Sequence, residues 1–160
     1  MLGYMLTTIA EVSGEEWAIR TAGTYVTEGS AMSGRTRDAL MNIEELGSHR
    51  YGAHRSHQLS DADCAWADVI LAAEADNVHF VRTNFASCAD KAVQLALFDR
   101  FATGRSLHEQ LREAVAHTPS AQFDVSDPAG GDQATYDACA RQLWNLAQAF
   151  ALIVQKERAD

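Results

Sequence analysis

Two carboxylates lie close together in a short polar segment of the C-terminal third of the chain. The segment reads Phe123-Asp-Val-Ser-Asp-Pro-Ala-Gly-Gly131 and holds Asp124 and Asp127. A positioned carboxylic acid can protonate a leaving group as a general acid. Pro128 favours an extended backbone at Asp127, which limits where the carboxylate can point. Asp-Pro followed by Gly-Gly is also ordinary turn chemistry, and a turn is the better interpretation of these residues taken alone.

Three histidines gather in the middle of the chain, at His49, His54 and His57. Histidine is a common metal ligand and proton carrier. No cysteine or carboxylate completes a recognisable metal-ligand spacing with them, so we expect no metal and no cofactor. Arg55 could attract phosphate, but a solvated surface charge is the favoured interpretation.

The three cysteines, Cys64, Cys88 and Cys139, form no C-x-x-C pair and no even-numbered framework. We therefore expect free thiols in a reducing cytosol. Cys64 falls in a predicted helix and Cys139 on an apolar helical stripe. Both are expected to be packing residues and not nucleophiles.

The composition predicts one domain over residues 1–160, because 160 residues with 47% hydrophobic content suffice for a single core. A formal net charge of −9 disfavours nucleic acid and anionic membranes as partners. No apolar run reaches the length of a membrane span. Residues 1–10 lack a basic leader, which argues against a secretory signal. We expect a cytoplasmic protein in which an anionic substrate meets a locally positive pocket.

Strand patterns alternate with helix patterns along the chain. Strands are predicted at Trp17–Thr21, Val69–Ala73 and Lys91–Phe98, and helices over residues 3–12, 35–46, 75–86, 107–116 and 135–156. Ser13-Gly14 should end the first of these helices, and Val78 and Val81 should face inward on the third. Ser60 with Asp63, and Ser106 with Glu109, have the spacing of helix capping boxes. The alternation predicts a parallel sheet with helices on both faces.

The apolar run Val69–Ala73 has the pattern of a buried parallel strand. In open α/β folds the carboxyl end of such a strand faces the ligand crevice. Residues 73–76 are therefore expected beside the working site.

Several segments resemble the low-molecular-weight protein-tyrosine phosphatases. His54-Arg-Ser-His-Gln-Leu followed by Ala67-Asp-Val-Ile-Leu-Ala-Ala-Glu resembles the middle of that family. Thr21-Ala-Gly-Thr resembles the Ser-Ala-Gly-Thr that closes its second strand. Asp127-Pro128 stands where the family carries an Asp-Pro, after the last strand and before the final helix. The resemblance implies a small α/β domain with a parallel sheet.

The resemblance also implies roles for individual residues. Asp127 would be the general acid that protonates the leaving oxygen, and then the base for the water that clears a phosphocysteine; Asp124 is a weaker candidate. His54 would support the phosphate-binding loop through hydrogen bonds, although a histidine satisfied at a helix start is the plainer alternative. Glu74, where the family often has an acidic residue, stays open.

The family's defining loop, C-x-x-x-x-x-R-S, does not occur in this sequence. The sixth residues after the three cysteines are Ile70, Gln94 and Asn145, and none is arginine. In the family the loop is commonly followed by Ser-Pro-Met and a helix, and residues 1–9 resemble that helix from its Met onward. We hypothesise an N-terminal truncation, through a late start codon, a cloning boundary or natural loss. The chain as given is expected to be inactive, and its exposed sheet edge would allow a homodimer.

Three functions remain after these observations. The first is a hydrolase acting on a phosphorylated protein or a small phosphomonoester through a phosphocysteine. The second is a non-catalytic binding or interaction module. The third is a thiol-dependent arsenate reductase relative, which needs the same absent cysteine. Family members active on phosphotyrosine often carry aromatic residues after Asp-Pro, whereas this chain has Ala129, Gly130 and Gly131, which weakens the assignment to phosphotyrosine.

Overall fold

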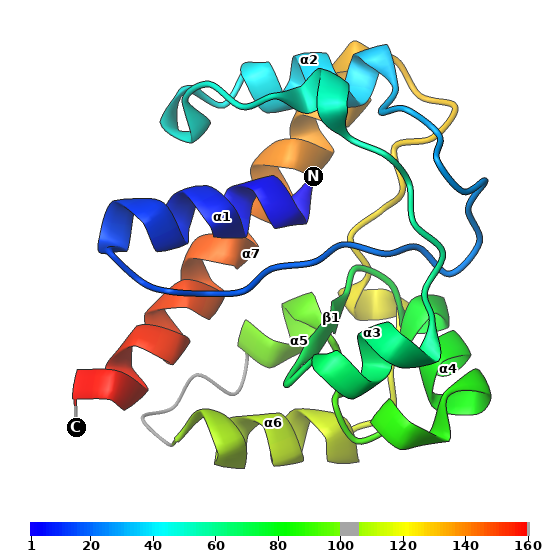
Figure 1. The fold of residues 1–160 in the computed structure, drawn as a ribbon, viewed down its shortest axis with the longest axis vertical. Helices are drawn as coiled ribbons and strands as arrows, with labels where there is room; N and C mark the ends of the chain where they lie inside the picture. Colours follow the sequence, from blue (N-terminus) through cyan, green and yellow to red (C-terminus); the bar gives the residue numbers. More distant parts are fainter. Residues whose placement is uncertain (100–105, 160) are drawn as a thin grey trace. The chain divides into compact units, whose positions relative to one another are not determined.

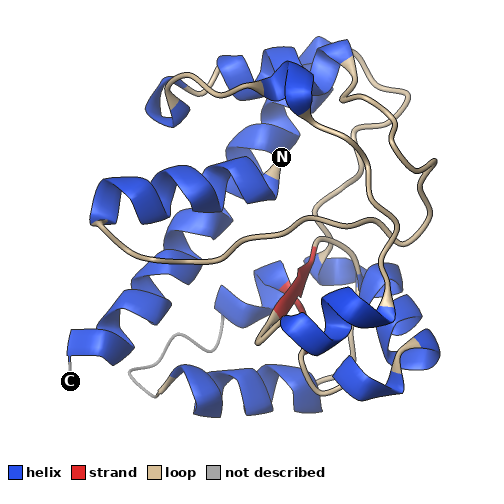
Figure 2. Cartoon of the chain, in the orientation of Figure 1, coloured by secondary structure: helices blue, strands red, loops and turns tan. Residues whose placement is uncertain are grey.

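The computed structural model describes residues 1–99 and 106–159, which form two compact units. Unit 1 contains Met1–Gln58 and Asp127–Gln148, and unit 2 contains Leu59–Ser126 and Ala149–Asp160. Helices make up most of both units, and the strands are short (Figures 1 and 2). The prediction of one domain over residues 1–160 stays a prediction. In the described part of the chain, no helix is both long and apolar enough to cross a membrane.

Unit 1 is built from helices. Its elements are α1 (Leu2–Ser13), α2 (Gly34–Met41), η1 (Glu44–Leu46), η2 (Tyr51–Ala53) and the first part of α7 (Gln133–Ala159). Met5, Leu6 and Ala10 of α1 are buried, as the helical spacing predicts. Gly14 ends α1 with a left-handed φ of 71°, and its N–H bonds to the last carbonyls of the helix. Both the helix and its stop were predicted correctly.

The helix predicted over residues 35–46 is interrupted in the structure. It ends at Met41, and Ile43 takes an extended conformation before the 3-10 turn η1. Side chains on both sides of the break bond to α7: Asn42 Nδ2 donates to Asp137 at 3.2 Å, and Glu45 pairs with Arg141 at 3.1 Å. These long-range contacts favour a corner where the local pattern alone predicts a continuous helix.

Unit 2 carries the sheet. Its elements are α3 (Asp61–Trp66), β1 (Ile70–Ala72), α4 (Ala75–Asn84), η3 (Ala86–Cys88), β2 (Ala92–Gln94), α5 (Leu95–Asp99), α6 (Leu107–Ala116), η4 (Ala121–Phe123) and the end of α7. β1 and β2 are parallel, with Ile70 opposite Ala92 and Leu71 opposite Val93. Both predicted capping boxes are present, at the starts of α3 and α6. The predicted fold class, α/β with a small parallel sheet and helices, is confirmed.

Two strand predictions need correction. Residues 15–22 form neither helix nor strand, and the nearest pairing is an isolated parallel bridge between Gly23 and Gln58. Alternation at Trp17–Thr21 is not enough, because a strand also needs a neighbour to complete its hydrogen bonds. The strand predicted over Lys91–Phe98 covers only residues 92–94 and continues as α5. Leu95, Leu97 and Phe98 are all buried there, and a helix can bury such closely spaced residues.

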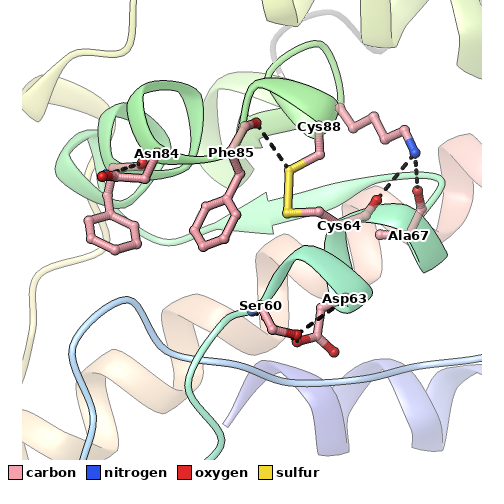
Figure 3. Close-up of a disulfide and its surroundings, with 9 residues drawn as sticks. Ser60, Asp63, Cys64, Ala67, Asn84, Phe85 and Cys88 are labelled. Atoms are coloured by element: carbon pink, nitrogen blue, oxygen red, sulfur yellow. Dashed lines mark hydrogen bonds between the residues drawn. A yellow bond between two sulfur atoms is a disulfide. The ribbon is translucent and has the colours of Figure 1, made fainter.

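The prediction of three free thiols is wrong for two of them. Cys64 and Cys88 form a disulfide across 24 positions of sequence (Figure 3). That spacing matches no disulfide framework or metal motif, so only the packing of α3 against η3 reveals the pair. Cys139 remains a thiol and is buried on α7, as its place on the apolar stripe predicts.

Candidate functional site

Asp127 lies on an exposed turn that leads into α7. Its Oδ1 accepts the Ala129 N–H at 3.0 Å, and the Gly131 N–H donates to the Pro128 carbonyl at 2.9 Å. This side chain-to-backbone bond is the usual Asx turn, as the turn interpretation of the sequence predicts. The turn also fixes the carboxylate of Asp127 at a defined, exposed place on the surface.

The start of α7 is fixed directly after this turn. Asp132 Oδ1 accepts both the N–H and the hydroxyl of Thr135, each at 2.9 Å. These two hydrogen bonds, the backbone one first, lower the pKa of Asp132. The turn bearing Asp127 is therefore bounded on its C-terminal side by a capped helix.

Asp124, the weaker acid candidate, is engaged in the structure of unit 2. Its Oδ1 accepts the Ala75 N–H at 2.7 Å and the side-chain amide of Gln94 at 2.6 Å. Gln94 is 1% exposed, and its amide also exchanges two hydrogen bonds with the backbone of Ser120, at 3.1 and 3.2 Å. A carboxylate next to the first N–H of a helix stabilises the helix, because its negative charge interacts favourably with the helix dipole. Asp124 thus serves as a structural acceptor, which makes it a poorer acid candidate than Asp127.

The segment after β1 lies beside the segment that leads to Asp127. The Ala73 carbonyl accepts the Val125 N–H at 3.0 Å, next to the bond between Ala75 and Asp124. Residues 73–75 and 124–125 therefore meet at the carboxyl end of the short sheet. In open α/β folds this is the edge that faces ligands.

His54 belongs to a group of aromatic rings in unit 1, which we call the Tyr4 cluster: Tyr4, His49, Tyr51 and His54. The ring of Tyr4 lies 4.9 Å from that of Tyr51, 5.4 Å from that of His49 and 6.2 Å from that of His54. Thr8 Oγ1 lies 2.6 Å from His49 Nε2 and holds that ring from the next turn of α1. Tyr4 is in the first turn of α1, so His54 faces the start of this helix.

The electrostatics around His54 and Tyr51 favour the neutral form of both side chains. Burial lowers the pKa of His54, and the positive charges of the chain's amino terminus and of Arg55 lower it further. Since an unperturbed histidine has a pKa near 6.5, His54 is neutral at pH 7. Burial also raises the pKa of Tyr51, with Tyr4 adding to the effect.

The remaining candidates have separate surroundings. Arg55 Nη1 donates to the carbonyls of Gly52 and His54, at 3.0 and 2.6 Å, and so caps its own turn. His57 pairs with Glu28 at 3.2 Å on the surface.

Among the described residues, no group of three or more His, Cys, Asp or Glu side chains could hold a metal ion. His54 and Asp127 both lie in unit 1. The ring of His54 packs in the Tyr4 cluster, whereas the carboxylate of Asp127 is bonded within its own turn.

Comparison with known proteins gives matches among solved structures. Models of known protein families do not match the chain, and neither does any curated protein at a significant level. The low-molecular-weight protein tyrosine phosphatase of T. tengcongensis matches with a TM-score of 0.73 and 21% identity, covering 93% of this chain and 86% of its own. YwlE arginine phosphatase from Geobacillus stearothermophilus matches with a TM-score of 0.71 and 25% identity, covering 98% and 87%. A low-molecular-weight phosphotyrosine phosphatase of Vibrio cholerae matches with a TM-score of 0.73 and 17% identity, covering 96% of this chain and 86% of its own.

These matches extend over nearly the whole chain. The protein therefore has the α/β fold of the low-molecular-weight protein-tyrosine phosphatases, and the resemblance predicted from the sequence is confirmed. The solved structures that share this fold include proteins named as tyrosine phosphatases and proteins named as arginine phosphatases.

Sequence reasoning missed Gln94, which joins the end of β2 to Asp124 and Ser120. A signal was present, because Gln94 is the one strongly polar residue in the run Ala92-Val-Gln-Leu-Ala-Leu97. A buried amide needs hydrogen-bond partners. A polar side chain in such a run therefore predicts a nearby polar partner, although it does not say which one.

Proposed function

We propose that this protein is a phosphatase of the low-molecular-weight type, which hydrolyses phosphomonoesters through a phosphocysteine once a C-x-x-x-x-x-R loop is supplied. The observation that carries this proposal is the fold match, which extends over 93–98% of the chain in the three structures described above. The given sequence contains neither the nucleophilic cysteine nor the arginine of such a loop. As given, the chain is inactive in this chemistry.

Asp127 is the proposed general acid. As a cysteine thiolate attacks phosphorus, the bond to the leaving oxygen breaks and that oxygen takes the proton of Asp127. The resulting carboxylate then accepts a proton from the water that attacks the phosphocysteine, which releases phosphate and regenerates the thiolate. The exposed turn at Asp127 supports this assignment, because it leaves the carboxylate accessible to a substrate.

His54 is proposed to support the phosphate-binding loop. It faces the first turn of α1 through Tyr4, and the first N–H groups of a helix favour a bound anion. A neutral imidazole keeps one donor and one acceptor, so it can bridge two backbone or hydroxyl groups of a neighbouring loop.

The substrate is proposed to be a phosphorylated protein or a small phosphomonoester. Ala129, Gly130 and Gly131 follow Asp127-Pro128 and offer no aromatic side chain to pack against a substrate ring. Specificity for a phosphotyrosine ring must then come from other residues of the site. A substrate without an aromatic ring would lose no binding energy at residues 129–131.

The test compares aryl phosphate hydrolysis by two proteins, this 160-residue chain and a version extended upstream in frame to the previous start codon. Only the extended protein should turn over, and replacing its new cysteine should abolish the rate. In that protein Asp127→Asn should lower kcat roughly 10²- to 10⁴-fold, the usual contribution of general acid catalysis. Asp68→Asn, another exposed carboxylate, is the matched control and should leave kcat unchanged.

The non-catalytic alternative takes over if both proteins are inactive while the short chain unfolds cooperatively. Turnover by the short chain would contradict the phosphocysteine mechanism directly. The arsenate reductase alternative needs redox thiols besides its nucleophile. Cys64 and Cys88 are bonded to each other, but the structures that share this fold are named as phosphatases, so the phosphatase remains the preferred function.

We also propose that two copies of this chain pair through the edge of β1. Ile70 N–H donates to the Lys91 carbonyl, so the backbone groups of the next residue, Leu71, point away from β2. The other side of the sheet is covered at Ala92, whose carbonyl accepts Arg82 Nη2 at 2.9 Å. Leu71 is only half-buried, although it lies in the most apolar run of unit 2. An open strand edge of this kind favours pairing with another strand.

Sedimentation over a range of protein concentrations tests the dimer. The wild-type chain should sediment as a dimer, and Leu71→Lys should shift it to a monomer because charged edge residues oppose strand pairing. Leu152→Lys, at a site that is 60% exposed on α7, is the matched control and should stay dimeric. A wild-type monomer at every concentration would contradict the proposal. The absence of nucleic acid and membrane partners remains part of our proposal, on the basis of the net charge of −9. A cytoplasmic location also remains a proposal.

A further inference from the structure

The disulfide of unit 2 joins two short elements that precede the two strands. Cys64 lies on α3, before β1, and Cys88 lies in η3, before β2, with their Cα atoms 5.4 Å apart. Figure 3 shows the bond between the helix that carries Cys64 and the turn that carries Cys88. The covalent loop closed in this way contains the whole of β1 and α4.

A second, non-covalent connection joins the same two elements. Lys91 Nζ donates to the carbonyls of Cys64 and Ala67, at 3.3 and 2.9 Å, at the C-terminal end of α3. The backbone N–H of Lys91 donates to the Cys88 carbonyl at 3.0 Å. The lysine therefore holds α3 and the turn at Cys88 together without the sulfur–sulfur bond.

Apolar packing holds both sulfurs in the same place. Cys64 and Cys88 are fully buried in one cluster of small and branched side chains. The other buried members are Ala72, Val78, Val81 and Ala92, and Leu59, Ile70 and Phe85 pack against them. A cysteine thiol is itself a small apolar group, so this cluster can also accommodate the reduced pair.

We propose that Cys64 and Cys88 form a reversible redox clamp that sets the stability of unit 2. Oxidation closes the clamp and ties α3 to η3, whereas reduction leaves two adjacent thiols held by Lys91 and the apolar cluster. This inference goes beyond the proposed phosphatase function and does not depend on it.

The clamp exchanges two electrons with a glutathione couple. When a local opening of unit 2 exposes the buried pair, one protein thiolate attacks oxidised glutathione to form a mixed disulfide and releases one glutathione thiolate. The second protein thiolate then attacks the cysteine sulfur of that mixed disulfide and releases the second glutathione, which leaves the Cys64–Cys88 bond. Both protein protons end on the two glutathione thiols, and the reverse sequence opens the clamp.

The closed clamp stabilises unit 2 chiefly by restricting the unfolded chain, because it closes a loop across 24 positions. Full reduction by excess dithiothreitol should lower Tm by roughly 5–10 °C, and oxidised glutathione should restore it. The double variant Cys64→Ala with Cys88→Ala should melt like the reduced protein and no longer respond to dithiothreitol. Cys139→Ala, which removes the other buried cysteine, should respond like the wild type.

Lys91→Met tests whether the reduced thiols are kept adjacent. Without the lysine, α3 separates more freely from the turn at Cys88, and the effective concentration of one thiol near the other falls. In glutathione buffers, the ratio [GSH]²/[GSSG] at half-oxidation should fall roughly fivefold, as expected for the loss of hydrogen bonds of this kind. Arg82→Met is the matched control. It also removes a bond from a cationic side chain to a carbonyl of unit 2, that of Ala92, but this bond does not connect α3 with η3. It should lower Tm but leave this ratio unchanged.

Three results would overturn the proposal. The first is that all three cysteines of the folded protein are alkylated after incubation with oxidised glutathione. The second is an unchanged Tm on full reduction. The third is a disulfide that only denaturant makes reducible, because a clamp must open in the folded protein. The comparison of oxidised with reduced wild type stands even if the double cysteine variant fails to fold.

Discussion

The carboxylate of Asp124 accepts the side-chain amide of Gln94 at 2.6 Å and the Ala75 N–H at 2.7 Å, so that Asp124 joins the end of β2 to the start of α4. Gln94 is almost fully buried, and its amide is also bonded to the backbone of Ser120. Buried polar networks of this kind stabilise a fold only when every member is satisfied. The pair therefore matters for the segment that leads to Asp127, even though neither residue is a proposed catalyst.

Removing either member of this pair should destabilise the protein. Asp124→Ala leaves the Ala75 N–H and one N–H of the Gln94 amide without an acceptor, and Gln94→Leu leaves Ser120 backbone groups unpaired. Each change should cost about 1–3 kcal/mol of unfolding free energy, measured by urea denaturation. The double variant should cost less than the sum, because the two side chains share a bond. Strict additivity would contradict the network, and Asp68→Ala should be neutral.

The left-handed glycine at the end of α1 gives a prediction with a matched control. Gly14 has a φ of 71°, whereas Gly34, at the start of α2, has no positive φ and no atom near the position of an added Cβ. Gly14→Ala should destabilise the protein by roughly 1–2 kcal/mol, because alanine is strained in that conformation. Gly34→Ala should be neutral or stabilise it by up to about 1 kcal/mol, since glycine lowers helix stability. Equal effects in thermal melts would contradict the conformational explanation.

Tyr51 gives a prediction of increased stability. Its side chain is buried, and its hydroxyl has no hydrogen-bond partner among the described residues. A buried hydroxyl without a partner carries a desolvation cost. Tyr51→Phe should therefore keep the ring contact with Tyr4 and raise the unfolding free energy by about 1 kcal/mol. Tyr4→Phe, at a half-buried ring, is the control; a loss of stability in Tyr51→Phe would show that the hydroxyl is bonded in solution.

Local patterns predicted the features of this fold that depend on neighbouring residues. The helix ended by Gly14, the capping box of Ser60 and Asp63, and the inward side chains Val78 and Val81 of α4 were all predicted correctly. Each depends on contacts within about one or two helical turns, and the sequence displays those contacts directly.

The errors arose where the outcome depends on distant residues. A strand at Trp17–Thr21 needs a partner strand, and the pairing of Cys64 with Cys88 needs two elements to pack 24 positions apart. No spacing rule expresses either condition. For the candidate site, the family resemblance pointed to Asp127 and His54. The hydrogen bonds that engage Asp124 became visible only with the folded chain.

The pKa of His54 predicts how stability changes below neutral pH. Burial lowers this pKa in the folded protein, and the nearby positive charges add to the effect. The unfolded chain therefore binds a proton near pH 6.5 while the folded chain resists it, so the unfolding free energy should fall as the pH drops through that value. His54→Gln should flatten this dependence between about pH 7 and pH 5.5 in urea denaturation. His108→Gln, an exposed position on α6, is the control and should keep the wild-type slope. An NMR titration of the folded protein in which His54 protonates above its usual value would reverse the predicted sign.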